Sequence, residues 1–502
     1  MQIFPDKQTF VTKYNKGLSQ VVWTNCIADL ETPVSAMMKI VKGEPNSFLL
    51  ESVEGGSIRG RYSFIGLNPD IIWRCSNDTA EINREASSNP DAFLPCPISE
   101  KFGVLKSLRE FREESRIKMP PGMPPMASGL VGYMAYDMVR LREKIPDKNP
   151  DVLGLPDSIF VRPTIMAVFD SLEDTITIVT PVWCNVSITA EDAFSDAKFR
   201  ISGVVSDLKS PMPLQLEATQ RESEVLKPKS NMTHEYFLKM IKKAIEYICA
   251  GDAFQIVPSQ RFSLQFLLSP LAYYRALRRL NPSPFLFFLN FGDFSIVGSS
   301  PEILVRVRNG QITLRPLAGT RKRGRSPEED SILAEELLSD PKELAEHLML
   351  LDLGRNDVGR VAKIGTVKPT EKFTIEYYSH VMHIASNVEG ELNTELFDPI
   401  DALFSGFPAG TVSGAPKVRA MEIIEELESE KRGVYGGCIG YFGADGDMDT
   451  CIALRTAIIK EGILYVQAGC GVVADSDPES EYQETIDKSQ ALIKAAEEAA
   501  QF

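Results

Sequence analysis

Two pairs of glutamates stand three residues apart in this chain. One pair is Glu343 and Glu346, and the other is Glu481 and Glu484. Residues three apart share one face of a helix, so each pair can direct two carboxylates towards one point. If the fold brings the two helices together, up to four carboxylates converge, and such a cluster needs a cation. Oxygen ligands that leave room for water and substrate favour Mg²⁺.

Both pairs also have an interpretation that involves no metal. Glutamates at this spacing are common on solvent-exposed helix faces, and the spacing taken alone favours that reading. Asp340-Pro341-Lys342-Glu343 has the pattern of a first helical turn, in which Glu343 would complete a capping box. The residues by themselves therefore leave the metal site and the structural role open.

Three further residues have types that could do chemistry. Glu302 follows a strand-like segment and is either a buried acid with a raised pKa or an ordinary exposed glutamate. His383 lies in a strand-like run, where a histidine more often packs than reacts. Arg455 is a cation among apolar residues, so we expect a carboxylate partner from a substrate or from the protein.

Two glycine-rich segments could approach a ligand with their backbone. Residues 469–474 match G-x-G-x-x-A after a strand, but a dinucleotide site needs a helix that opens inside the motif. We expect that 475–478 do not open a helix, which argues against nucleotide binding. Residues 407–417 form a loop that enters a helix with Pro416 as its first residue. Such an entry either attracts anions or simply caps the helix.

Charge and cysteine usage limit the class of protein. The formal net charge of −15 disfavours binding to nucleic acid and to anionic membranes, so a small anionic substrate would need local cations. Eight cysteines show no metal-ligand spacing, which is typical of free thiols in a reducing compartment. We see neither a membrane-spanning apolar run nor a signal peptide. We therefore predict a cytoplasmic protein with no membrane or nucleic-acid partner.

The chain divides at a polar segment with little periodicity, residues 211–230. This linker would separate an N-terminal part, 1–210, from a C-terminal part, 231–502. Expected elements of the C-terminal part include a helix capped by Thr233, a strand over 254–266 and a helix that begins at Ser269-Pro270. Helices are also expected near 327–338, 341–353 and from about Glu481.

The order of strands and turns predicts the fold class. Asn309-Gly310 is a strong signal for a hairpin turn, and several other strands follow one another directly. Consecutive strands joined by tight turns pair antiparallel. We therefore expect a mixed α/β protein of the α+β type, with large antiparallel β-sheets covered by helices.

Taken in order, the motifs between about residues 235 and 500 resemble those of the chorismate-utilising enzymes. Each motif is weak alone, but the ordered set is very specific. It comprises 251–255 (GDAFQ), 298–302 (GSSPE), 316–321 (PLAGTR), 343–347 (ELAEH), 353–357 (LGRND), 381–383 (VMH), 407–411 (FPAGT), 433–437 (GVYGG), 454–455 (LR) and 484–488 (ETIDK). The resemblance implies that family's fold, in which large antiparallel sheets pack face to face.

Two positions are informative within this family. Isochorismate and salicylate synthases carry lysine where this chain has Gln255, and common aminodeoxychorismate synthases carry lysine where it has Ala318. With neither lysine, the chain is most similar to anthranilate synthases, which convert chorismate and ammonia to anthranilate and pyruvate, the first committed step of tryptophan biosynthesis. Aminodeoxychorismate synthesis is the alternative.

The resemblance also implies roles for site residues. Mg²⁺ would be held by Glu346 and Glu484, with Glu343 and Glu481 holding its waters or completing the ligand set. The implied catalytic residues are Glu302 as general acid, His383 as assistant in pyruvate elimination, and Thr411 beside the ring. The implied substrate-binding residues are Gly319, Thr320, Tyr435, Arg455, Gly469, Cys470, Gly471 and Lys488.

Regulation and partners follow from the resemblance as well. Residues 49–52 (LLES) and 281–284 (NPSP) resemble the tryptophan feedback site of anthranilate synthases, with Ser52, Pro284, Phe285 and Leu286 as the binding residues. The usual continuation Tyr-Met is Phe285-Leu286 here, which keeps an apolar indole pocket feasible. The chain contains no recognisable glutaminase domain. The implied source of ammonia is a separate glutamine amidotransferase subunit, in a heterotetramer of two large and two small subunits.

Overall fold

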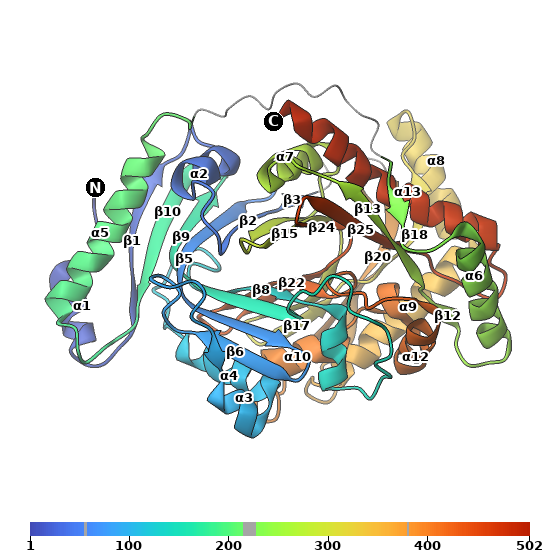
Figure 1. Cartoon of the computed structure of the whole chain (residues 1–502), viewed down its shortest axis with the longest axis horizontal. Coiled ribbons are helices and arrows are strands. Elements are labelled where there is room, and N and C mark those ends of the chain that lie inside the picture. The colour runs from blue at the N-terminus through green and yellow to red at the C-terminus, as the bar shows by residue number, and fades with distance from the viewer. Residues whose placement is uncertain (55–57, 214–226, 379–380) are drawn as a thin grey trace.

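The computed structural model describes residues 1–54, 58–213, 227–378 and 381–502 (Figure 1). Most of the expected linker, 214–226, and His380 lie outside the described residues. Of the linker's remaining residues, 211–213 are exposed, and Lys229–Ser230 form the short strand β11.

The N-terminal part is a set of long antiparallel strands with helices on their outer face. Its main strands are β1 (Gln20–Ile27), β2 (Ser47–Glu51), β5 (Tyr62–Ser76), β6 (Thr79–Asn83), β8 (Gly129–Met134), β9 (Ser158–Asp170) and β10 (Thr175–Val182), with short strands β3 (Val53–Glu54), β4 (Ile58–Arg59) and β7 (Leu94–Pro95). Its helices are α1 (Lys7–Tyr14), α2 (Pro33–Ile40), α3 (Pro97–Phe102), α4 (Val104–Glu114) and α5 (Ala190–Leu208).

The C-terminal part mixes shorter strands with the helices that carry the candidate site. Its strands are β12 (Gln255–Ile256), β13 (Ser259–Gln265), β14 (Phe285–Asn290), β15 (Phe294–Ser300), β16 (Ile303–Arg308), β17 (Gln311–Leu314), β18 (Leu317–Lys322), β19 (Lys368–Tyr377), β20 (Val381–Glu391), β21 (Gly414–Ala415), β22 (Cys438–Gly443), β23 (Met448–Ile452), β24 (Thr456–Lys460) and β25 (Ile463–Gly469). Its helices are α6 (His234–Cys249), α7 (Pro270–Leu280), α8 (Pro327–Ser339), α9 (Pro341–Gly359), α10 (Pro399–Gly406), α11 (Gly410–Ser413), α12 (Lys417–Leu427) and α13 (Pro478–Glu498).

Antiparallel hydrogen bonding joins the two parts into one sheet network. In β2 and β14, Glu51 pairs with Leu286; in β8 and β22, Tyr133 pairs with Ile439. A buried ion pair crosses the same boundary, because Arg278 of α7 donates to Glu51 at 2.7 and 2.9 Å. Residues on both sides of the linker therefore build a common core.

Alternating side chains show that the sheets pack face to face. In β15, Phe294 and Ile296 lie in a core shared with β8 and β9, whereas Val297 packs towards α7. In β22, Ile439 joins that shared core, and Phe442 packs in a second cluster with residues of α4 and α10. Since neighbouring strand residues point to opposite faces, helices cover the outer faces while the inner faces meet. The predicted fold class is confirmed.

Several local predictions are also confirmed. Thr233 caps α6 through its side chain, and Ser269 caps α7 with Pro270 in the first turn. Asn309 and Gly310 have φ values of 49° and 78°, as a hairpin turn of this kind requires.

Other local predictions are wrong. Residues 475–478 do open a helix, because Asp477 accepts from the Ser480 amide and Pro478 begins α13. Pro416 is the cap that precedes α12 and not its first residue. The strand expected over 254–266 is interrupted between β12 and β13, where the Val257 amide donates to the carbonyl oxygen of Ser413, the last residue of α11. The described helices are all too short or too polar to span a lipid bilayer.

Candidate active site

His383 lies in β20 beside the first residues of β18. Its Nδ1 is 3.0 Å from Thr320 Oγ1 and 3.3 Å from the carbonyl oxygen of Gly319. A carbonyl can only accept, so the contact with Gly319 places the proton on Nδ1 and leaves Nε2 as an acceptor. Burial and the nearby Arg455 lower the pKa of His383 to about 4. The ring is therefore neutral near pH 7.

The sequence allowed Glu302 to be either a buried acid or an exposed glutamate, and the structure shows that it is buried. It lies between β15 and β16 and is 6% exposed. Thr411 of α11 donates its hydroxyl to the carboxyl group at 3.2 and 3.4 Å, and the Leu317 amide of β18 also donates to it. Burial outweighs these two donors and raises the pKa of Glu302 to about 8. The carboxyl group therefore carries a proton near neutral pH.

The four predicted glutamates lie on α9 and α13. The charge of a glutamate on one helix affects the pKa of a glutamate on the other. Burial raises the pKa of Glu346, and the neighbouring Glu343 and Glu484 raise it further. Burial and Glu484 likewise raise the pKa of Glu481. Carboxylates from both helices therefore come within electrostatic range.

Two of these carboxylates form ion pairs with cationic side chains of the protein. Glu343 accepts from Arg321 at 3.0 Å and Glu484 pairs with Lys488 at 2.7 Å. Asp340 caps α9, but the Glu343 side chain contacts Arg321 and does not complete a capping box. Within the described part of the chain, no three His, Cys, Asp or Glu side chains are grouped closely enough to hold a metal ion.

Polar side chains approach the backbone closely at Gly469 and Gly471, where a larger residue would leave no room for them. A Cβ on Gly469 would stand 2.7 Å from the Tyr435 hydroxyl, and a Cβ on Gly471 would stand 2.8 Å from Gln255 Nε2. Gln255 in turn donates to Glu346 at 3.2 Å, and Lys488 donates to Gly469 O at 3.0 Å. The glycine segment thus connects the tyrosine, the lysine and the glutamates.

Cys470 lies between these glycines with its side chain inside the protein. It is fully buried in an apolar cluster with Phe237 and Val472, and its thiol lies near Glu481. Burial raises the pKa of Cys470 well above its usual value. A ligand at this segment would therefore contact the Cys470 backbone and not its thiol.

Gly319 brings β18 close to α9. Its φ of +78° favours glycine, and an added Cβ would meet Ile384 at 3.0 Å and the Glu343 carboxylate at 3.2 Å. This close approach places the β18 backbone that contacts His383 beside Glu343 of α9.

Arg455 has no carboxylate partner among the described residues. It follows the end of β23 in a left-handed conformation, with φ 46°, rather than within a strand. Its Nη1 is 3.4 Å from Asn281 Oδ1, and no ion pair to an acidic side chain accompanies this contact. Burial lowers its pKa, yet a guanidinium stays charged at neutral pH. A partly buried arginine that has no carboxylate partner among the described residues is suited to an anionic ligand.

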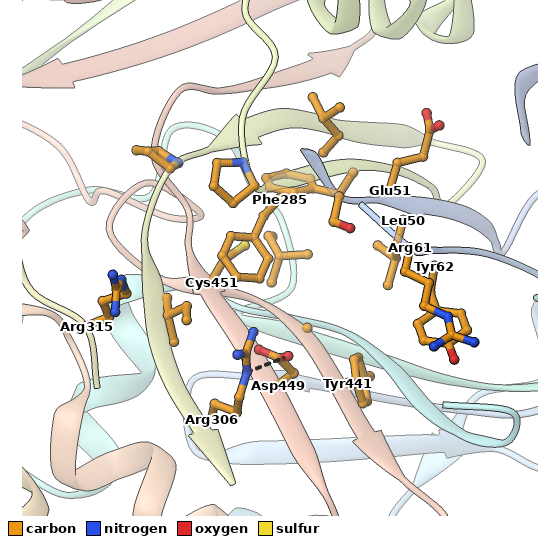
Figure 2. A pocket seen from close by; sticks show the side chains of 18 of the residues that line it. Leu50, Glu51, Arg61, Tyr62, Phe285, Arg306, Arg315, Tyr441, Asp449 and Cys451 are labelled. Carbon is orange, nitrogen blue, oxygen red and sulfur yellow. Dashed lines mark hydrogen bonds and ion pairs between the residues drawn. The ribbon is translucent and has the colours of Figure 1, made fainter. Parts of the chain in front are cut away.

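The four residues predicted to bind tryptophan line one cavity of about 810 Å³ (Figure 2). Ser52 follows β2, and Pro284, Phe285 and Leu286 lead into and begin β14. Figure 2 shows Phe285 and Leu50 on one wall and the ion pair of Arg306 with Asp449 on another. The cavity therefore has an apolar wall and a charged wall.

The structure connects the predicted residues of the site through contacts that the sequence did not indicate. The contacts of Gln255 with Glu346 and of Asn281 with Arg455 join residues 91 and 174 positions apart. Arg432 was also missed; it is 2% exposed and donates to Val412 O beside Thr411 and to Val257 O. Only folding brings these positions together, so no spacing in the sequence could identify them.

Comparison with known proteins places the chain in a family. The profile of the chorismate binding enzymes matches residues 67–494. The chain is 55% identical over 495 residues to anthranilate synthase component 1 of Cereibacter sphaeroides, covering 99% of this chain and 98% of that protein. It is 46% identical over 478 residues to the protein of the same name from Aquifex aeolicus, covering 95% and 94%.

Solved structures also match the chain over most of its length. The crystal structure of anthranilate synthase component I from Streptococcus pneumoniae TIGR4 superimposes with a TM-score of 0.75 at 37% identity, covering 93% of this chain and 99% of that one. The isochorismate synthase MenF of Escherichia coli, at 19% identity and a TM-score of 0.69, shares the fold; that match covers 98% of this chain and 100% of that one. The chain belongs to the chorismate binding enzymes. The relatives that resemble it over nearly their whole length carry the name anthranilate synthase component 1.

Gly469→Ala should disturb the glycine segment. The new Cβ would stand 2.8 Å from Pro258 O, a backbone atom that cannot move aside freely. We expect the free energy of unfolding to fall by about 1–3 kcal/mol, as measured by chemical denaturation. Gly203→Ala is the matched control, since no atom other than its chain neighbours and the nearby backbone of α5 lies within 4 Å of its added Cβ. Equal stability of the two variants would contradict the close approach.

Proposed function

We propose that this chain is the chorismate-converting component of an anthranilate synthase, which makes anthranilate and pyruvate from chorismate and ammonia. The observation that carries the proposal is that the β18 backbone contacts both a protonated Glu302, through the Leu317 amide, and a neutral His383, through the Gly319 carbonyl oxygen, near Arg455, which has no carboxylate partner among the described residues. The names of the full-length relatives support the same reaction.

Chorismate carries two carboxylates, and the chain offers cationic or donor groups for both. Arg455 and Tyr435 would bind the enolpyruvyl carboxylate. Lys488 and the backbone at Gly469 and Gly471 would bind near the ring carboxylate. Gly319, Thr320 and Thr411 would border the ring, so that Glu302 and His383 lie at its edge.

The carboxylate oxygens of the four glutamates are the ligands that a hard divalent cation prefers, but in the described structure the side chains would have to move closer together to hold one. Oε2 of Glu481 is buried and lacks a hydrogen-bond partner among the described residues, and only oxygen atoms are offered. We propose that Glu346, Glu484, Glu343 and Glu481 hold Mg²⁺, with Arg321 and Lys488 neutralising the carboxylates in its absence. When bound, Mg²⁺ would neutralise the ring carboxylate and fix the ring.

The chain's own residues would move the protons. Ammonia adds at C2 while the C4 hydroxyl leaves, and Glu302 gives that hydroxyl its proton so that water departs. The amino intermediate then loses its enolpyruvyl group as pyruvate, which aromatises the ring. His383 would assist this elimination through Nε2, because Nδ1 is already engaged by Gly319.

Ammonia needs a source, because near neutral pH it is mostly ammonium. The name of the relatives, component 1, implies a second component. We propose that this partner is a glutamine amidotransferase and that two copies of each chain form a heterotetramer in the cytoplasm.

The product distinguishes this function from aminodeoxychorismate synthesis. With chorismate, Mg²⁺ and ammonium at alkaline pH, we expect the purified chain to release equal amounts of anthranilate and pyruvate. Chromatography and a coupled pyruvate assay would measure both. A product that retains its enolpyruvyl group would support the alternative, and no product would favour a binding protein.

Turnover should depend on the protonation of Glu302. A general acid acts in its protonated form, and its pKa is raised to about 8. At a fixed concentration of free ammonia, we therefore expect kcat to fall as the pH rises through about 8. Glu302→Gln should lower kcat by roughly 10²–10⁴-fold and remove this fall. A variant that keeps the wild-type pH profile would exclude Glu302 as the acid.

Glu484→Gln should weaken the response to Mg²⁺. Loss of one ligand charge should raise the Mg²⁺ concentration for half-maximal turnover at least about tenfold, with the fold intact by circular dichroism. Glu479→Gln is the matched control, because Glu479 lies on the same helix but is exposed and contacts His234. Similar Mg²⁺ curves for both variants would argue against the assignment.

We also propose that residues 1–210 form a regulatory part and 231–502 the catalytic part, with tryptophan bound in the 810 Å³ cavity. Ser52→Phe would fill space beside Pro284 and Leu286, so we expect the tryptophan concentration for half-inhibition to rise at least about tenfold, a loss of about 1.4 kcal/mol. Inhibition curves measure this, with exposed Ser187→Phe as control. Wild-type sensitivity in Ser52→Phe would place tryptophan elsewhere.

A further inference from the structure

The large cavity and the candidate active site share a wall. Pro301 and Ile303 line the cavity, and Glu302 between them points to the other side, towards Thr411. Leu317 also lines the cavity, and its amide donates to the Glu302 carboxyl group. Residues of the cavity wall are thus the direct neighbours of the candidate acid.

Tyr378 is the part of this wall that touches His383. It lines the cavity, is 7% exposed, and its ring meets the His383 ring edge-on at 5.4 Å between centroids and 68°. His383 was a predicted site residue, whereas this tyrosine, which stands between β19 and β20, was not.

The position of the Tyr378 ring is fixed at several points. Its hydroxyl donates to Glu376 at 2.8 Å, and Glu376 is held by Arg315, whose side chain also borders the cavity. Its amide donates to Val381 O at 2.8 Å, and Arg323 donates to its carbonyl oxygen at 2.5 Å. The ring is therefore a rigid surface for the imidazole.

The hydrogen bonds of His383 alone do not fix the orientation of its ring. Thr320 Oγ1 and Gly319 O both contact Nδ1, and the described residues offer no such partner to Nε2. Contacts at one atom allow the ring to tilt about that atom. The edge of the Tyr378 ring supplies the second contact that sets where Nε2 points.

We propose that Tyr378 is a positioning residue that orients His383 for the reaction, and that through it a molecule in the cavity acts on the chemical step. The proposal rests on the proposed function for the reaction itself, whereas the contact with His383 can be measured without turnover. A plain packing role is the alternative, and it would not change the state of the His383 ring.

Steady-state kinetics of the full chain provide the first test. Tyr378→Leu removes the ring, and we expect kcat for anthranilate formation to fall at least about tenfold, part of the usual acid–base contribution, with KM for chorismate changed less than about threefold. Tyr378→Phe keeps the ring and should restore most of kcat. Tyr377→Leu is the control, because its half-exposed ring lies over Arg323. Wild-type kcat in Tyr378→Leu would overturn the proposal.

Nuclear magnetic resonance of the histidine rings provides the second test. The chain has four histidines, so the His383 signal can be assigned by its loss in His383→Gln. In long-range ¹H–¹⁵N spectra we expect one tautomer, protonated at Nδ1, in wild type and Tyr377→Leu. The His383 signal should shift in Tyr378→Leu. An unchanged His383 signal would overturn the proposal, and Tyr378→Met serves if the leucine variant does not fold.

Added L-tryptophan tests the role of the cavity. We expect it to shift the His383 signal in wild type and not in Tyr378→Leu. If calorimetry detects tryptophan binding while the His383 signal stays unchanged, the transmission through Tyr378 is wrong. If tryptophan does not bind, the proposed feedback site is wrong, while kinetics and the ligand-free spectra still decide whether Tyr378 positions His383.

If wild type forms no anthranilate, the proposed function is wrong. The ligand-free spectra then decide by themselves whether Tyr378 positions His383.

Discussion

Removal of ionisable groups from water is the constraint on which the candidate site depends. It raises the pKa of Glu302 to about 8 and lowers that of His383 to about 4, so an acid and a neutral imidazole coexist near pH 7. The same burial lowers the pKa of Arg455 and raises the pKa of Glu346. Without this burial the groups would be an ordinary exposed glutamate, histidine and arginine.

The sheets create that dry environment because they are covered on both faces. Strand β18 contacts both the Glu302 carboxyl group and the His383 ring through its backbone. Helices α9 and α13 contribute the four glutamates and Lys488.

Much of this arrangement could be predicted from the sequence, for identifiable reasons. The Asn309-Gly310 turn and the caps at Thr233 and Ser269 depend on local chemistry, and they were found correctly. The start of α13 was placed at about Glu481 instead of Pro478, because Asp and Pro are as typical of turns as of the first turn of a helix. The contact of Asn281 with Arg455 and the ring of Tyr378 against His383 could not be predicted, since they depend on how distant strands pair.

The pairing of β2 with β14 and of β8 with β22 has a consequence for the unity of the chain. If the polypeptide were divided at the polar segment, the C-terminal piece would carry two strands with unsatisfied amide and carbonyl groups along one side. Open edges of this kind recruit other strands, so separated halves would associate wrongly or aggregate. Each part of the chain therefore satisfies the backbone hydrogen bonds at an edge strand of the other part.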